Sequence, residues 1–183
     1  MKTTLPLRTK LLFSTGDLST SIPLAILMFF QLYFLTDVAG LRPDYAGWAI
    51  GASRLWDAVN DPLFGLLSDR IRTRWGRRRP FLLFFSIPFG LCFMLLWWAP
   101  PWESQIARML TVMVAFMISD TFQTLVTVPF YALMPEIAPQ YDQRTNLAGY
   151  RMVFNLLASL ATAVSAPMIV KAGLNAGWTL QQG

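Results

Sequence analysis

The chain has 183 residues, of which 55% are hydrophobic and 14% are charged, and its formal net charge is +5. A soluble domain usually carries about a quarter charged residues, so this composition excludes a typical soluble protein and a disordered one. The single cysteine, Cys92, excludes a disulfide-rich fold, and the lack of histidine excludes a Ser-His-Asp triad and an ordinary zinc site. No phosphate-binding glycine motif is present either, so we expect neither an enzyme nor a bound cofactor.

The positive charge is concentrated in one place. Six of the 15 lysines and arginines lie within Arg70–Arg79, between two long apolar segments. Membrane proteins place basic residues in such loops on the cytoplasmic side. We therefore expect the basic balance to reflect contact with membrane lipids and not with nucleic acid.

Five apolar segments are long enough to cross a membrane, which takes about 20 residues. Lipid permits only helices or closed barrels, and the alternating segments of about 10 residues that build a barrel do not occur. The first segment differs from a signal peptide because Asp17 interrupts it and the apolar run continues to Leu35. The sequence predicts an all-α, polytopic membrane protein with five spans, at residues 11–36, 45–68, 80–99, 106–134 and 147–171.

Cations at the ends of the predicted spans indicate the orientation. Eleven lie on the side of the N-terminus and of the basic loop 69–79, three lie on the opposite side, and Arg54 lies within a span. The positive-inside rule therefore predicts a cytoplasmic N-terminus.

The second span carries charged residues that are costly in lipid, and such residues are functional candidates. Arg54, Asp57 and Asp61 share one helical stripe, and the two aspartates are one turn apart, with Cβ atoms about 5–6 Å from each other. Two bare carboxylates would repel in this setting, so either they share a proton or a cation lies between them. Oxygen ligands, with help from the Asn60 amide, suit a hard cation such as Na⁺. The alternative is a structural network in which Arg54 neutralises Asp57.

The fourth and fifth spans each carry polar side chains along one helical face. Such faces predict a wet cavity for a polyhydroxylated or anionic solute, although small polar residues also join membrane helices without any cavity. We favour this joining role for Ser159 and Thr162 and the cavity for the charged members and Asn155. The two faces comprise Asp120, Thr124, Thr127 and Tyr131, and Arg151, Asn155, Ser159 and Thr162.

Several motifs, in the correct order, resemble a known family. Gly65–Pro80 (GLLSDRIRTRWGRRRP) is similar to the loop between spans two and three of the major facilitator superfamily. Arg54–Pro62 (RLWDAVNDP) resembles the second-helix motif of its glycoside–pentoside–hexuronide:cation symporters, the melibiose permease group. Thr36–Leu41, the pair Gly16-Asp17, and Pro129–Arg151 resemble further segments of that group. The matches cover nearly the whole chain.

The resemblance implies roles for individual residues. Asp57 and Asp61 match the family's cation-coordinating carboxylates, Asn60 is adjacent to them, and Thr124 fits a threonine that assists Na⁺ coordination. Tyr131 falls where an aromatic ring stacks on sugar. Together with the polar faces, this gives the candidate substrate-binding residues Asp17, Arg54, Asp120, Thr127, Tyr131, Arg151 and Asn155, and the gate motif Gly65, Asp69, Arg70, Gly76, Arg77 and Arg78.

Two positions depart from the family pattern. Thr127 stands where melibiose-type members have an aspartate, and Asp120 lies two turns away on the same face. Ser21 stands where their first helix has a sugar-binding aspartate, unless Asp17 substitutes for it. Galactoside specificity is therefore not implied.

The family fold has 12 spans in two halves, so we expect this chain to be most of an N-terminal half that lacks the C-terminal half and is not competent alone. The complete protein is expected to be a secondary transporter in a bacterial-type inner or plasma membrane that couples sugar or glycoside uptake to Na⁺ or H⁺. The alternatives are a carrier of lipid or another amphipathic solute on the same scaffold, and a membrane remnant or assembly partner that transports nothing.

Overall fold

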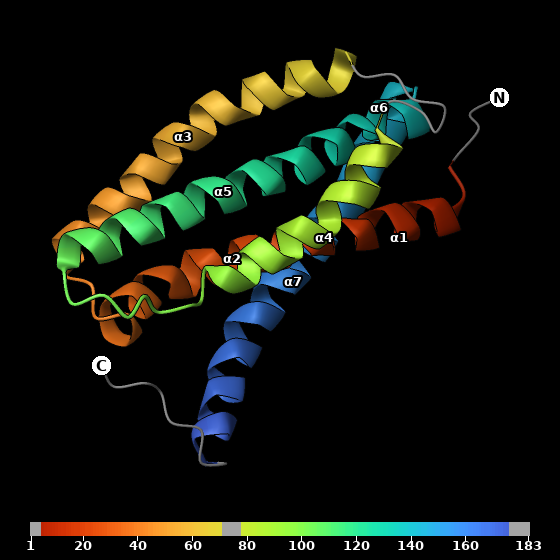
Figure 1. Ribbon diagram of the computed structural model, residues 1–183. Helices are drawn as coiled ribbons and strands as arrows, with labels where there is room; N and C mark the ends of the chain where they lie inside the picture. Colours follow the sequence, from red (N-terminus) through yellow and green to blue (C-terminus); the bar gives the residue numbers. More distant parts are fainter. Residues whose placement is uncertain (1–4, 71–77, 176–183) are drawn as a thin grey trace. The chain divides into compact units, whose positions relative to one another are not determined.

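The computed structural model describes residues 5–70 and 78–175, and this part of the chain is helical and contains no β-strand (Figure 1). The all-α prediction is therefore confirmed. In chain order the helices are α1 (Leu7–Gly16), α2 (Leu18–Tyr33), the π-helix η1 (Phe34–Val38), α3 (Pro43–Arg70), α4 (Arg79–Leu95), α5 (Gln105–Ala132), α6 (Met134–Ile137) and α7 (Tyr141–Asn175).

The chain divides into two compact units. The first contains the residues up to Gln31 and those from Met134 onward, and the second contains Leu32–Leu133. The first unit is thus built from α1, most of α2, α6 and α7, and the second from η1, α3, α4 and α5.

Apolar length accounts for most of these helices. Leu7–Val38, Gln105–Ile137 and Tyr141–Met168 are long and apolar enough to cross a membrane, and Pro80–Leu95 is a shorter apolar helix. The helix α3 is 28 residues long but is not among them. It carries Arg54, Asp57 and Asp61, which the sequence analysis identified as functional candidates. We therefore look for the functional site on α3.

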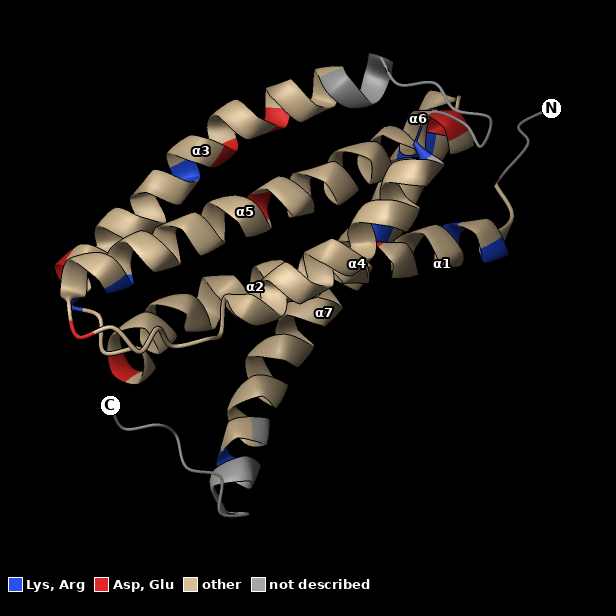
Figure 2. Cartoon of the chain, in the orientation of Figure 1, with Lys and Arg blue, Asp and Glu red and all other residues tan. Residues whose placement is uncertain are grey.

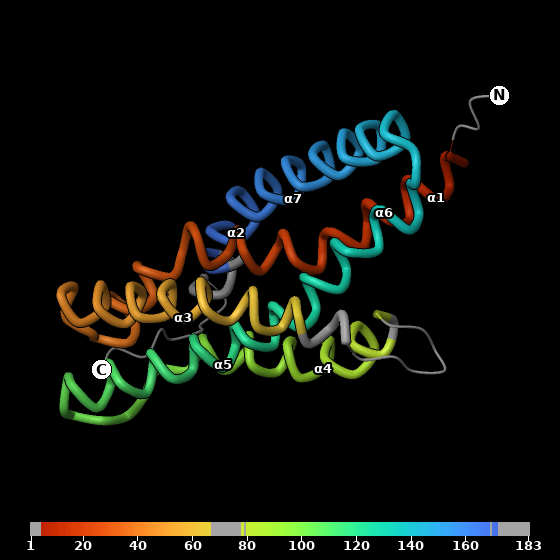
Figure 3. The backbone as a smooth tube through the Cα atoms, turned by 90° about the horizontal axis from the view of Figure 1, so that it is seen from above, coloured from red at the N-terminus to blue at the C-terminus, as the bar shows by residue number. Residues whose placement is uncertain are grey.

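In the second unit, α3 and α5 lie side by side, and α4 also packs on α5 (Figures 1 and 3). Aromatic residues fill the contact between α4 and α5. Phe81 and Phe89 of α4 are buried, and the ring of Phe85 lies 6.2 Å from that of Phe122 on α5.

A polar clamp joins the beginnings of α3 and α5. The Gln105 side chain accepts a bond from the Arg42 backbone at 3.1 Å and donates one to the Gly40 carbonyl at 3.0 Å. The Arg108 guanidinium donates to the carbonyls of Ala39 and Gly40, each at 3.2 Å. Gly40 has a φ of 62°, a left-handed conformation that glycine adopts without strain. The turn after η1 therefore presents its carbonyls to α5 and fixes where the two helices start relative to each other.

In the first unit, α1 packs on α7. The expected single span over residues 11–36 is divided, because α1 ends at Gly16 and α2 begins at Leu18. Asp17 occupies the junction, where its backbone N–H bonds to the Ser14 carbonyl. The break thus places a carboxylate at the join of two helices, and this carboxylate is only 2% exposed.

Replacing Gly40 by alanine tests the clamp. Because an L-residue in the left-handed region costs roughly 1–2 kcal/mol, G40A should lower the free energy of unfolding of the purified chain in detergent by about that amount. Asparagine tolerates this conformation better, so G40N is the matched control and should cost less. Equal stability of G40A and the wild type in a denaturant titration would show that the turn does not hold α3 and α5 together.

Candidate functional site

The helices α3 and α5 run parallel and in register. Trp56 Nε1 donates to Thr121 Oγ1 at 3.1 Å, and Asn60 Nδ2 donates to Thr124 Oγ1 at 3.2 Å. The partners are separated by 65 and 64 residues, and those of the Arg42–Gln105 bond by 63. A nearly constant separation means that each step along α3 is matched by a step along α5, so the register set at the clamp determines which side chains meet further along.

Thr124 is the centre of the cluster that this register assembles. Its hydroxyl accepts the bond from Asn60 and donates to Asp61 Oδ1 at 2.9 Å. Thr124 and Asn60 are buried, with exposed fractions of 4% and 2%, whereas Asp61 is exposed. Three of the four predicted cation ligands therefore lie together.

One oxygen in this cluster has no hydrogen-bond donor. The Asn60 side chain donates an amide N–H to Thr124, and its Oδ1 atom is buried without a partner in the described structure. A buried acceptor left unpaired is costly, and such atoms require an explanation. A cation beside Asn60 would supply one.

The fourth predicted ligand, Asp57, lies one turn before Asp61 on α3. It is half-buried and interacts electrostatically with Asp61 and Arg54. Asp120 of α5, also half-buried, interacts with the same three charged groups. Figure 2 shows separate charged bands along α3 and α5, with uncharged turns between them.

The negative charges in this cluster exceed the positive one. Three carboxylates face a single guanidinium, and Asp57, Asp61 and Asp120 form no ion pair within the part of the chain that the structure describes. Arg54 interacts electrostatically with Asp57, but the two form no salt bridge in the described residues. A further positive charge would stabilise the cluster.

The cluster offers two carboxylates, an amide oxygen and a hydroxyl. Among the described residues no group of three or more His, Cys, Asp or Glu side chains comes together as a transition-metal site would require. Hard oxygen donors of mixed charge are what alkali and alkaline-earth cations take.

In the first unit, the predicted residues Asp17 and Arg151 form a buried ion pair. Arg151 NH2 lies 2.9 Å from Asp17 Oδ1, and the side chains are 17% and 3% exposed, respectively. The guanidinium also lies over the Phe13 ring, 5.8 Å from its centroid, and within 3.5 Å of Met134 Sδ. One turn further along, Asn155 Nδ2 donates to Ser21 Oγ at 2.7 Å.

The remaining candidates are placed as follows. Thr127 Oγ1 is buried and has no partner in the described structure, and Tyr131 is 42% exposed. Gly65 faces Val128, which an added Cβ would meet at 3.9 Å, so it lies at the α3–α5 contact. Arg78 is half-buried at the start of α4. The side chains of Asp69 and Arg70, and all of Gly76 and Arg77, lie outside the described residues.

The sequence reasoning missed the partners of the predicted residues. Trp56, Thr121 and Ser21 had no assigned role, although each bonds across a helix pair. The signal that could have found them is the separation itself: once Asn60 is paired with Thr124, the same step predicts Trp56 opposite residue 120 or 121.

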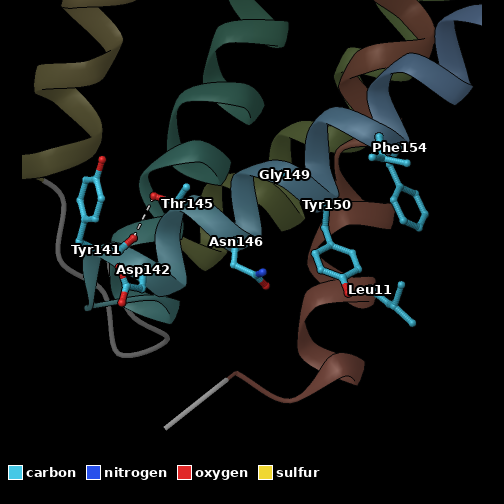
Figure 4. A pocket seen from close by; sticks show the side chains of 9 residues that line it. Leu11, Tyr141, Asp142, Thr145, Asn146, Gly149, Tyr150 and Phe154 are labelled. Atoms are coloured by element: carbon cyan, nitrogen blue, oxygen red, sulfur yellow. Dashed lines mark hydrogen bonds between the residues drawn. The ribbon is translucent and has the colours of Figure 1, made fainter. Parts of the chain in front are cut away.

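A groove of about 740 Å³ lies elsewhere in the first unit (Figure 4). Its walls are Leu11 of α1 and the first turns of α7, with Tyr141, Tyr150 and Phe154 as the aromatic members. Lys10 Nζ lies 5.3 Å from the centroid of the Tyr150 ring. None of the predicted site residues lines this groove.

Comparisons with known proteins show which family this sequence matches. The family described as MFS/sugar transport protein matches residues 12–180. An uncharacterized symporter of Synechocystis, sll1374, is 37% identical over 171 residues, which cover 91% of this chain and 31% of that protein. The putative glycoside/cation symporter YagG of Escherichia coli is 34% identical over 168 residues, which cover 91% of this chain and 36% of that protein. The sodium-dependent lysophosphatidylcholine symporter 1-A of Danio rerio is also 34% identical, over 170 residues that cover 92% of this chain and 32% of that protein.

These matches confirm the resemblance drawn from the motifs. The chain spans about a third of the length of the curated relatives it matches.

A double-mutant cycle tests the buried ion pair. Because a buried charge without its partner is strongly destabilising, Arg151→Gln alone should lower the free energy of unfolding by about 3–5 kcal/mol. The double variant Asp17→Asn/Arg151→Gln removes both charges and should lose less than the single one. Asn155→Ala, which removes the neutral bond between α7 and Ser21 of α2, should cost about 1 kcal/mol and serves as the control. Additive losses in chemical denaturation would contradict the pairing.

Proposed function

Because the chain belongs to the MFS/sugar transport protein family, we propose that it is part of a secondary transporter that couples the uptake of a sugar or glycoside to a cation. Family membership and the long apolar helices make it an integral membrane protein and a transporter component, not an enzyme. The coupled substrate and the ion are our proposals for the complete protein.

The observation that carries this proposal is the Asn60–Thr124–Asp61 cluster. Two hydrogen bonds join Thr124 of α5 to Asn60 and Asp61 of α3, and among the described residues the buried Asn60 oxygen has no donor. Asp57, one turn away, adds a second carboxylate that forms no salt bridge in this part of the chain. A monovalent cation bound by these oxygens would pair the acceptor and reduce the excess negative charge at once.

The ligand set favours Na⁺ over H⁺. A proton needs only one carboxylate oxygen and would leave the Asn60 acceptor as it is. Sodium takes several oxygen ligands, and a neutral amide and hydroxyl lower the charge of the site to suit a single positive charge. The Danio relative that is named sodium-dependent supports the same choice.

The substrate residues follow from the polar faces. In the second unit we assign Arg54, Asp120, Thr127 and Tyr131 to the substrate, and in the first unit Asp17, Arg151 and Asn155. If Na⁺ binding favours the conformation in which these side chains accept a sugar, each ligand raises the affinity for the other, typically by 1–3 kcal/mol.

The cation count supports the orientation. With a cytoplasmic N-terminus, the loop 69–79 faces the cytoplasmic leaflet of a bacterial inner membrane or a plasma membrane, where its arginines attract anionic lipid headgroups.

A lysophospholipid is the second candidate substrate. The relative named a lysophosphatidylcholine symporter is as similar to this chain as the putative glycoside symporter, with 34% identity in each case. The cation site would serve either substrate. Competition between a labelled glycoside and lysophosphatidylcholine in the uptake assay separates the two.

Uptake by the complete gene product in proteoliposomes tests the proposal. An inward Na⁺ gradient should concentrate a labelled glycoside, and D61N should abolish this accumulation because it removes a charged ligand. Thr121→Val is the matched control: it deletes another hydroxyl that bonds to α3, costs about 1 kcal/mol of stability and leaves coupling intact. Gradient-driven accumulation by D61N at the wild-type level would refute the role of the cluster.

A further inference from the structure

An ion pair joins α7 to the junction between α1 and α2, and its acid and base come from two long stretches of sequence that hold no other charged residue. Residues 11–31 contain a single charged residue, Asp17, and residues 145–170 contain a single one, Arg151. In the predicted spans 11–36 and 147–171, Asp17 lies six residues and Arg151 four residues beyond the first residue, about 9 Å and 6 Å along the helix. Both charges therefore lie within apolar segments, closer to the cytoplasmic ends of the predicted spans than to their middles.

The guanidinium is enclosed by this environment. The carboxylate of Asp17 lies at 2.9 Å, the Phe13 ring covers one side, and Met134 Sδ lies within 3.5 Å. With its partner 3% exposed and Arg151 itself 17% exposed, the pair is weakly solvated. The attraction between the two charges is therefore strong, because water and salt screen them little.

A second polar contact, between α2 and α7, is neutral. Asn155 bonds to Ser21, and both this bond and the ion pair join residues 134 apart, so the two contacts lie along one register. These two contacts thus bring together one pair of opposite charges and one pair of neutral hydrogen-bonding groups.

We propose that Asp17 acts as a specificity residue that restricts the Arg151 site to substrates without net charge. This inference rests on the proposed function, in which Arg151 binds the substrate. A neutral polyhydroxylated solute adds hydrogen bonds to a balanced pair. A monoanionic solute either brings an uncompensated charge into a weakly solvated site or displaces Asp17 and leaves that carboxylate buried alone. Asp17 therefore occupies the position beside Arg151 in which a substrate carboxylate would otherwise bind.

The test compares matched probes in the complete gene product. A 4-nitrophenyl glucoside and the corresponding glucuronide share their aglycone, but the glucoside has a hydroxymethyl group where the glucuronide has a carboxylate. The corresponding galactoside and galacturonide form a second pair. The wild type should take up the neutral member of a pair at least tenfold faster. D17N removes the carboxylate beside Arg151 and should shift the ratio of rates toward the uronide by tenfold or more.

Two controls separate charge from structure. Asp17→Glu keeps the charge and should keep the wild-type ratio. Ser21→Ala weakens the neutral contact and should lower both rates together, with the ratio changed by less than twofold. Arg151→Gln is the second variant, for use if D17N does not reach the membrane, and should shift the ratio further against the uronide.

Each outcome decides the matter. An unchanged ratio in D17N, or equal loss of both rates in D17N and in Arg151→Gln, makes the ion pair purely structural and overturns this inference while leaving glycoside symport in place. A wild type that takes up neither member of either pair refutes the proposed sugar transport, and the inference falls with it.

Discussion

A carboxylate within a membrane span needs a positive charge beside it, and the described chain meets this requirement in two different ways. Asp17 has its counter-ion built in, since Arg151 lies 2.9 Å away and both side chains are largely buried. Asp57, Asp61 and Asp120 share one arginine and form no ion pair in the described residues. Charged groups in lipid are expensive, so an unbalanced cluster is retained only where something else balances it. The first arrangement is complete within the protein, and the second is suited to a cation taken from solution.

Both arrangements depend on parallel helices held in register. Between α3 and α5 the bonded partners stay 63 to 65 residues apart, from the clamp at Gln105 to the cluster at Thr124. Between the first helices and α7 the separation is 134 at both polar contacts. Packing between lipid-embedded helices is not driven by the hydrophobic effect, so a few interhelical hydrogen bonds determine which faces meet. The same bonds that join the helices therefore also position the ligands.

Much of this could be predicted from the sequence. Apolar length predicted the helices, and charge within the second span identified Asp57 and Asp61 before any geometry was known. The division of the first span at Asp17 was not predicted, because the apolar pattern continues through Gly16-Asp17 and the break comes from local backbone bonding. The partners Ser21, Trp56 and Thr121 were missed because periodicity shows which residues share a face of one helix, whereas pairing between helices depends on a register that a turn such as the one at Gly40 establishes.

The central claim, that a cation lies against Asp57 and Asp61, is tested most directly at those carboxyl groups. A hydrophobic carbodiimide modifies membrane-embedded carboxyl groups, and mass spectrometry of the digested protein measures the labelled fraction at each aspartate. The account predicts that Na⁺ protects Asp57 and Asp61, that K⁺ at equal ionic strength does so less, and that Thr124→Val weakens the protection. Labelling of both aspartates that is the same with Na⁺, with K⁺ and without either cation would contradict it.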